Sequence, residues 1–330
     1  MDLSTLPHPD AVRPAPTARA RHELWLLGQP PLEKYLSYIS AYGADSVPGP
    51  GGAGANMPTR GELVRQWAQA NDYYDVLAER EAGVADHMPH APLAPALAPL
   101  AEALMARTHY REAFDMLPTR VAMVELARLV VCQNHVNHEY VGQLKLSLGS
   151  RPSPEQLFRF CLPLDDCPTP VEVREEGSKR YTFRSCSTDL RLHETLLLRP
   201  GQLQQYAPSG TLAGVVGVVV GYGSNFLNAL EDDDNGRMIL NNGYHRACAL
   251  LELGIEHAPC IVQTVSRRDE LDIAARPVVA KDPGYFFNGA RPPLLRDFAD
   301  PRIVRLVPAV RLTKTIEVTI DVHEFFSREK

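Results

Sequence analysis

The residues best suited to chemistry lie together in one short segment, residues 241–265, with the sequence NNGYHRACALLELGIEHAPCIVQTV. Gly243, Tyr244, His245 and Arg246 fall where we expect a helix to begin, and the first N–H groups of a helix lack internal partners. A glycine lets a ligand approach the backbone closely, while a histidine and an arginine add hydrogen bonds and charge. The segment therefore predicts a site for a phosphate or a carboxylate. Alternatively, the arginine is structural and pairs with a buried acid.

Local signals predict the elements that would position these residues. Residues 238–240 are apolar and lead out of the core, and the side chain of Asn241 or Asn242 can cap the following helix. Apolar residues at spacing i, i+3 and i+4 give this helix one buried face. Gly254 stands where a glycine commonly ends a helix, and the apolar pair at 261–262 fits a buried strand. We expect a strand, a turn, a helix and a second strand.

This Gly-x-His-Arg helix start resembles the ParB/sulfiredoxin superfamily, in which such a turn opens a helix and holds nucleotide phosphates. A weaker likeness lies at 117–146, where Gln133 stands at the position of the family's glutamine. The resemblance covers roughly residues 117–265, with a long insertion between its two ends. It implies a mixed sheet with helices, and ATP or another nucleotide with Mg²⁺ as the ligand.

The chain departs from the superfamily at positions that carry its chemistry. Sulfiredoxins place their catalytic cysteine immediately before the His-Arg pair, where this chain has Tyr244. The free-serine kinases have an aspartate where Asn242 stands here, and an amide cannot act as a base. ParB clamps carry a separate helix-turn-helix domain, which is not recognisable in this sequence. We therefore do not expect any of these activities in its usual form.

Two further segments carry polar residues suited to the same site. Residues 219–225 leave an apolar strand through two glycines, so Ser224 and Asn225 either hydrogen-bond a ligand or simply follow a tight turn. Residues 184–191 supply either an acid and a cation to the cleft or an ordinary ion pair. We predict catalytic roles for Glu125, Glu139, Asp189 and His245. We predict ligand contacts from Asn242, Gly243, Tyr244, His245, Arg246, Ser224, Asn225 and Arg191.

Two clusters have the residue types of metal ligands, but each has a simpler interpretation. His135 and His138 with Glu139 could share one helix face and bind a metal, or form a solvated helix start. The acidic residues 232–234 could hold Mg²⁺, or form a solvated hairpin tip. We favour the simpler interpretation in both cases and predict no metal site formed by protein side chains alone.

The sequence predicts an α+β protein divided into four segments. Residues 1–20 are rich in proline and alanine and should form a disordered tail. Residues 21–116 should form a helical region, with a capping box that starts a helix at Thr59 and Glu62. Residues 117–270 should form the ParB/sulfiredoxin-like domain. Residues 271–330 should be a strand-rich extension packed on the body.

Composition narrows the class of protein. The 330 residues carry a formal net charge of −6, and no dense Lys/Arg cluster is interleaved with aromatic residues, which argues against nucleic-acid binding. The six cysteines form no CxxC pair and are expected to be reduced and mostly buried. The longest apolar run, residues 212–220, is too short to span a bilayer. No secretory signal is recognisable, so we expect a cytoplasmic protein without a membrane partner.

Three functions are consistent with these features. The first is a nucleotide-binding phosphotransferase or hydrolase that acts on a small phosphorylated ligand. The second is a non-catalytic sensor or scaffold whose helical N-terminal region contacts a protein partner. The third is a ParB-like DNA binder or nuclease, which the acidic charge balance disfavours.

Overall fold

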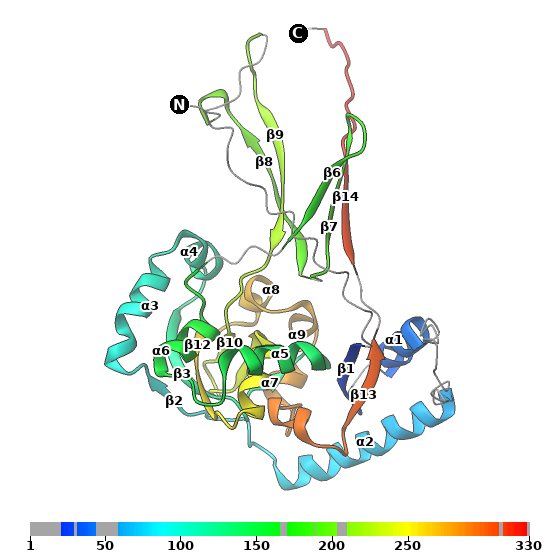
Figure 1. The fold of residues 1–330 in the computed structure, drawn as a ribbon, viewed down its shortest axis with the longest axis vertical. Helices are drawn as coiled ribbons and strands as arrows, with labels where there is room; N and C mark the ends of the chain where they lie inside the picture. Colours follow the sequence, from blue (N-terminus) through cyan, green and yellow to red (C-terminus); the bar gives the residue numbers. More distant parts are fainter. Residues whose placement is uncertain are drawn as a thin grey trace.

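A computed structural model describes residues 21–29, 32–43, 59–165, 170–187, 189–202, 210–309 and 313–328. These residues form a mixed α+β body from which two β-structures project, as Figure 1 shows. The expected α+β class is thus confirmed at this level, while the specific ParB/sulfiredoxin architecture stays a prediction. The predicted disordered tail, residues 1–20, lies outside the described residues.

The body is built on a six-stranded mixed sheet at its centre. In spatial order its strands are β2 (His90–Pro92), β3 (Thr119–Glu125), β12 (His257–Val265), β10 (Asn228–Asp232), β11 (Met238–Asn242) and β4 (Val130–Val131). β12 runs parallel to β10 and antiparallel to β3. Most residues of β12 are buried, because the strand is central and covered on both faces. The apolar stretch at 121–131 belongs to β3 and β4, which are joined by a turn at 126–129.

Helices surround this sheet and complete the main hydrophobic core. They are α3 (Ala98–Met105), α4 (Thr108–Phe114), α5 (His138–Leu148), α6 (Pro154–Cys161), α7 (Tyr244–Glu252), α8 (Leu271–Ala274) and α9 (Pro277–Lys281). α3 and α4 are separate helices, because Arg107 adopts an extended conformation between them. α5 packs directly against α7. Short 3-10 or π turns are η1 (Pro95–Leu97), η2 (Pro200–Gln202), η3 (Arg268–Glu270), η4 (Gly284–Asn288) and η5 (Leu295–Ala299).

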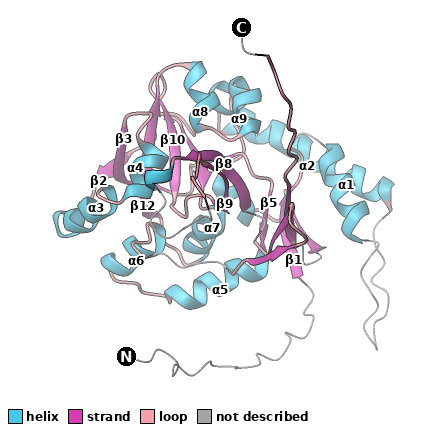
Figure 2. Ribbon diagram, turned by 90° about the horizontal axis from the view of Figure 1, so that it is seen from above, coloured by secondary structure: helices cyan, strands magenta, loops and turns pink. Residues whose placement is uncertain are grey.

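A second, smaller core lies on one side of the body. Here β1 (Arg21–Leu26) pairs with β13 (Val304–Ala309) and with β5 (His135–Asn137). α1 (Leu32–Gly43) and α2 (Arg60–Arg80) pack on this sheet through Trp25, Tyr35 and Trp67. Seen from above in Figure 2, these helices lie opposite α3, β2 and β3.

The segment predicted as helical, residues 21–116, contains α2 with the expected capping box between Thr59 and Glu62. It also contains β1, where the sequence analysis expected no strand. Each backbone partner of β1 lies more than a hundred residues away along the chain, so no local signal indicates the strand. β1 and β2 join sheets with strands of the later segments, and the division into four segments stays a prediction.

Two β-structures project from the body in Figure 1. One is a three-stranded sheet of β6 (Glu172–Glu175), β7 (Arg180–Ser185) and β14 (Lys314–Thr319). The other is a two-stranded ribbon of β8 (Leu190–Leu198) and β9 (Val215–Tyr222), which we call the β8–β9 ribbon. Within the described ranges, no helix combines the length and the apolar character needed to cross a membrane.

Candidate functional site

The start of α7 has backbone groups available to a ligand. Gly243 is the N-cap residue with φ of +93°, and no side chain caps the helix there. A Cβ atom at this position would lie 2.6 Å from Cδ1 of Leu227, so only glycine fits. Within the described part of the chain, no acceptor is assigned to the backbone N–H groups of Tyr244, His245 and Arg246. These three donors form the core of the candidate site.

The prediction that Asn241 or Asn242 caps the helix is wrong, because Gly243 is the N-cap residue. β11 continues through Asn242, which pairs with Asn228 across the sheet, so the chain is still extended at the predicted cap. The side chain of Asn241 donates to the carbonyl of Ala274 at 2.9 Å, and that of Asn242 donates to the carbonyl of Ser224 at 2.6 Å. The predicted glycine at the other end is confirmed, because Gly254 and Ile255 donate to the carbonyls that close a Schellman motif.

Arg246 is a partly buried cation whose protein partners are neutral. Its guanidinium donates to the carbonyl oxygen of Asn225 at 2.7 Å and also to Oδ1 of the same residue. No described carboxylate lies within ion-pair distance of it. Burial lowers the pKa of Arg246, as expected for a charge that lacks full solvation. The alternative prediction, that this arginine pairs with a buried acid, therefore finds no such acid in the described residues.

Other arginines of the body differ from Arg246 because they have carboxylate partners. Arg120, Arg128, Arg237 and Arg291 are each paired with at least one carboxylate. Arg237 and Arg291 are buried and the other two are partly buried, so the fold neutralises these guanidinium groups with acids of its own, as is usual in proteins. Arg246 departs from that pattern.

His245 is a neutral hydrogen-bonding residue here. Its Nε2 accepts the backbone N–H of Asn137 at 3.0 Å, which assigns the ring proton to Nδ1. Burial, reinforced by the neighbouring Arg246, lowers the pKa of His245 to about 4. The ring also meets Tyr140 of α5 edge-on, with 5.2 Å between ring centroids. At neutral pH this histidine offers one N–H donor and no positive charge.

Tyr244 can contribute to a ligand only through its backbone. Its side chain is 3% exposed, and its hydroxyl donates to the carbonyl of Leu240. The same hydroxyl accepts the backbone N–H of Cys132 at 3.1 Å, which connects α7 to the residue that follows β4. The phenol ring is thus part of the core, whereas the N–H of this residue is one of the three free donors.

The loop before β10 joins several of the predicted residues. Ser224 and Asn225 contact Asn242 and Arg246 through the hydrogen bonds described above. Directly before them, Gly223 donates its N–H to Oδ2 of Asp189 at 2.9 Å. The structure therefore brings both ends of this loop beside predicted site residues.

Asp189 and Arg191 form an ion pair with each other at the base of the β8–β9 ribbon. This is the simpler of the two interpretations of that segment. Arg191 also lies against Gly223, where an added Cβ would meet its guanidinium. The pair borders the loop of the candidate site but is already neutralised.

The two glutamates predicted as catalytic bases are engaged elsewhere. Glu125, at the end of β3, pairs with Arg128 at 3.3 Å. Glu139 accepts the backbone N–H of His22 at 2.8 Å and lies 2.7 Å from its Nδ1. Partial burial would raise the pKa of Glu139, but the hydrogen bonds from His22 outweigh it and hold the pKa below its usual value. No hydrogen bond or ion pair joins either glutamate to the described residues at the start of α7.

Across the described ranges, no group of three or more His, Cys, Asp or Glu side chains is arranged to hold a metal ion. His135 lies in β5, where its ring stacks on Trp25 at 4.5 Å between centroids. Asp232 closes β10, and the neighbouring acidic residues form the turn between β10 and β11.

Arg276 is a cation near α7 that the sequence analysis did not predict. Its guanidinium donates to Oε1 of Gln133 at 2.9 Å and lies 5.5 Å from the centroid of the Tyr244 ring. Like Arg246, it has no carboxylate within ion-pair distance in the described ranges. It precedes α9, in a segment outside the family resemblance. No local motif marks it, because its proximity to α7 arises from the tertiary fold.

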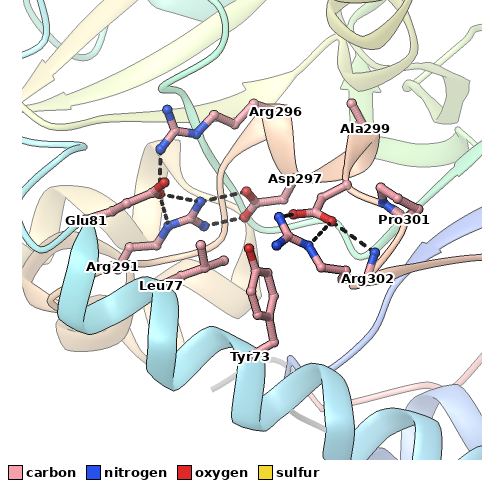
Figure 3. A pocket seen from close by; sticks show the side chains of 10 residues that line it. Tyr73, Leu77, Glu81, Arg291, Arg296, Asp297, Ala299, Pro301 and Arg302 are labelled. Atoms are coloured by element: carbon pink, nitrogen blue, oxygen red, sulfur yellow. Dashed lines mark hydrogen bonds and ion pairs between the residues drawn. The ribbon is translucent and has the colours of Figure 1, made fainter.

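A hollow of ≈ 490 Å³ lies between α2 and η5 and contains none of the predicted site residues. Figure 3 shows that its charged side chains engage one another, with Arg291 between Glu81 and Asp297. Arg296 shares Glu81, and Arg302 pairs with Asp300. Its three guanidinium groups are thus matched by three carboxylates, which gives an anion no net attraction.

Comparisons with protein-family models, with curated proteins and with solved structures find no match to this chain.

Proposed function

We propose that this protein binds a phosphorylated small molecule, with a nucleotide as the leading candidate, at the start of α7. The observation that carries this proposal is the pairing of Arg246. This partly buried guanidinium is held by one asparagine and has no carboxylate partner among the described residues. Beside it lie three backbone N–H groups without acceptors.

A partly buried charge without a counter-ion is energetically costly. Removing a cation from water costs several kcal/mol unless an opposite charge or a full set of hydrogen bonds replaces the solvent. Two oxygen atoms of Asn225 satisfy only part of the five N–H donors of a guanidinium. An anionic oxygen placed between Arg246 and the free N–H groups of α7 would supply the missing charge.

A second cation supports a ligand larger than a single phosphate. Arg276 has no described carboxylate partner, and it lies over the ring of Tyr244 in the first turn of α7. Two cations suit a diphosphate or triphosphate.

The resemblance to the ParB/sulfiredoxin superfamily supports a nucleotide as this ligand, with Gly243, His245 and Arg246 at the phosphates. Mg²⁺ would then enter with ATP or another nucleotide and be held largely by phosphate oxygens. His245, neutral at pH 7, would contribute its Nδ1–H as a donor.

Binding without turnover is the form of this proposal that the geometry favours. A general base must lie within hydrogen-bond reach of the proton that it takes. Glu125 and Glu139 are held by Arg128 and His22, and Asp189 is paired with Arg191. The protein is therefore proposed as a ligand sensor or scaffold, and the helical N-terminal region is proposed to contact its protein partner.

A thermal-shift screen tests this function. Wild type is heated with inorganic phosphate, pyrophosphate, ATP or CTP, each with and without Mg²⁺. A ligand at one hundred times its Kd stabilises the fold by about 3 kcal/mol, so a hit raises Tm measurably. A phosphate-release assay on the hits distinguishes binding from hydrolysis. If none of these anions changes Tm, the proposed function is wrong.

A further inference from the structure

The β8–β9 ribbon has an open edge with an unusual composition. β9, with the sequence VVGVVVGY, contains no charged residue and no proline. In the part of the chain that the structure describes, β9 pairs only with β8, so the backbone groups on its other edge have no strand partner. An uncharged and unprotected edge of this kind is a template for pairing with another strand.

One face of the same ribbon exposes large apolar side chains. Leu197 and Val216 lie opposite each other across the two strands and are 68% and 74% exposed. Leu192, opposite Val220, is 53% exposed. A two-stranded ribbon is only marginally stable by itself, and more strands or a packed face are needed to stabilise it. Figure 1 shows the ribbon projecting from the body, away from the central sheet.

We propose that β9 pairs antiparallel with β9 of a second copy of this chain, so that two ribbons form one four-stranded sheet. A twofold contact of this kind is isologous, since the same residues are used on both sides. Full-length antiparallel pairing of residues 215–222 places Val218 of one copy opposite Val219 of the other. Every side chain brought together along this contact is uncharged.

Charge distinguishes β9 from β6 and from β8 of the projecting structures. β6 carries Glu172 and Glu175, so antiparallel pairing with its own copy would place these carboxylates opposite each other. Like charges directly opposite destabilise a strand pair. β8 carries Arg191 and Glu194, and it already contacts β14 of its own chain. β9 can meet its own copy without such repulsion, which favours a second copy as its partner.

The test is the mass of the full chain in solution, measured by sedimentation across a concentration series. Wild type should show twice the mass of the 36.5 kDa chain. The double variants Val218→Lys/Val219→Lys and Val218→Glu/Val219→Glu should each show the single-chain mass, because like charges face each other across the twofold. An equimolar mixture of the two should recover the double mass, because lysine then faces glutamate. This recovery also shows that both variants fold.

The control is Val171→Lys/Val173→Lys, which changes exposed valines in and beside β6 and should keep the wild-type mass. A wild type that stays a single chain at every concentration overturns the proposal. The proposal is also overturned if either double variant, measured separately, still shows the double mass. It is overturned as well if the mixture of the two does not recover the double mass.

Discussion

Arg246 and Asn225 form a fork in which the guanidinium donates to both the backbone carbonyl and the side-chain oxygen of the asparagine. The fork holds the arginine beside the open start of α7 but leaves its charge without a described counter-ion. A structural arginine of this body is paired differently, as Arg237 is with Asp86. Under the proposed function an external anion would supply this counter-ion, which leads to the first prediction.

Replacing Arg246 with methionine should leave the ligand-free protein at least as stable as wild type. The variant removes a partly buried charge that has no described carboxylate partner. The matched control is Arg237→Met, which leaves Asp86 without its partner and should cost about 3–5 kcal/mol. Urea unfolding in a buffer without phosphate or sulfate measures both. A loss for Arg246→Met as large as that for Arg237→Met would assign the arginine a purely structural role.

Gly243→Ala should destabilise the protein by about 2–4 kcal/mol, combining the strain of a positive φ with overpacking. Its Cβ would lie 2.6 Å from Leu227, which is fully buried. Gly254→Ala is the control, since it has a φ of +74° but open space around its Cβ, and it should cost only about 1 kcal/mol. Equal losses for the two variants would show that Leu227 moves aside.

Stability should fall as the pH drops from about 6.5 to about 4. The folded pKa of His245 is lowered to about 4, so in this range the unfolded chain binds a proton that the folded chain does not. The contribution of His245 to the free energy of unfolding is fully present above about pH 6.5. As the pH falls below this value, up to about 3 kcal/mol of the free energy of unfolding should be lost through this residue. His135 has the same lowered pKa of about 4 and adds to the effect.

Urea unfolding at a series of pH values measures this loss. His245→Gln, whose side-chain oxygen can still accept the N–H of Asn137, should show a shallower dependence than wild type. An unchanged slope would mean that His245 is solvated and ionises normally in the folded protein.

Tyr244→Phe should lower the free energy of unfolding by about 1–3 kcal/mol, because the backbone groups of Leu240 and Cys132 lose a buried partner. Ligand affinity should not change, since only the backbone N–H of this residue is free for a ligand. Denaturation and calorimetry on the same sample separate the two effects. A large loss of affinity with little loss of stability would place the phenol in the binding site.

Sequence patterns predicted the parts of this region that depend on neighbouring residues. The glycine turn, the apolar face of α7 and the end of the helix at Gly254 all follow from local spacing, and the structure has them. The asparagine cap was wrong because β11 extends through Asn242, an outcome decided by pairing with β10. Cap preference is local, whereas strand length is set by the sheet.

Long-range contacts determined what the sequence did not reveal. Arg276 reaches Gln133 from a segment 143 residues later, so no motif could join them. Glu139 had the right chemistry for a base, but its partner His22 lies 117 residues away along the chain. Glu125 differs, because its partner Arg128 is only three residues further on and is a local contact. Residue type indicated which side chains have suitable chemistry, whereas the tertiary fold determines which of these side chains contact one another.

Isothermal titration of ATP, pyrophosphate and inorganic phosphate, with and without Mg²⁺, tests the central claim most directly. Wild type should bind at least one of them with one site per chain. Arg246→Met should lose at least about tenfold in affinity, since charge-assisted hydrogen bonds contribute about 1.5–3 kcal/mol each. Arg276→Met should weaken pyrophosphate more than inorganic phosphate. Arg159→Met, which removes an exposed cation of α6, is the control and should bind as wild type does. Equal affinity in wild type and Arg246→Met, or no binding in wild type, would contradict an anion site at the start of α7.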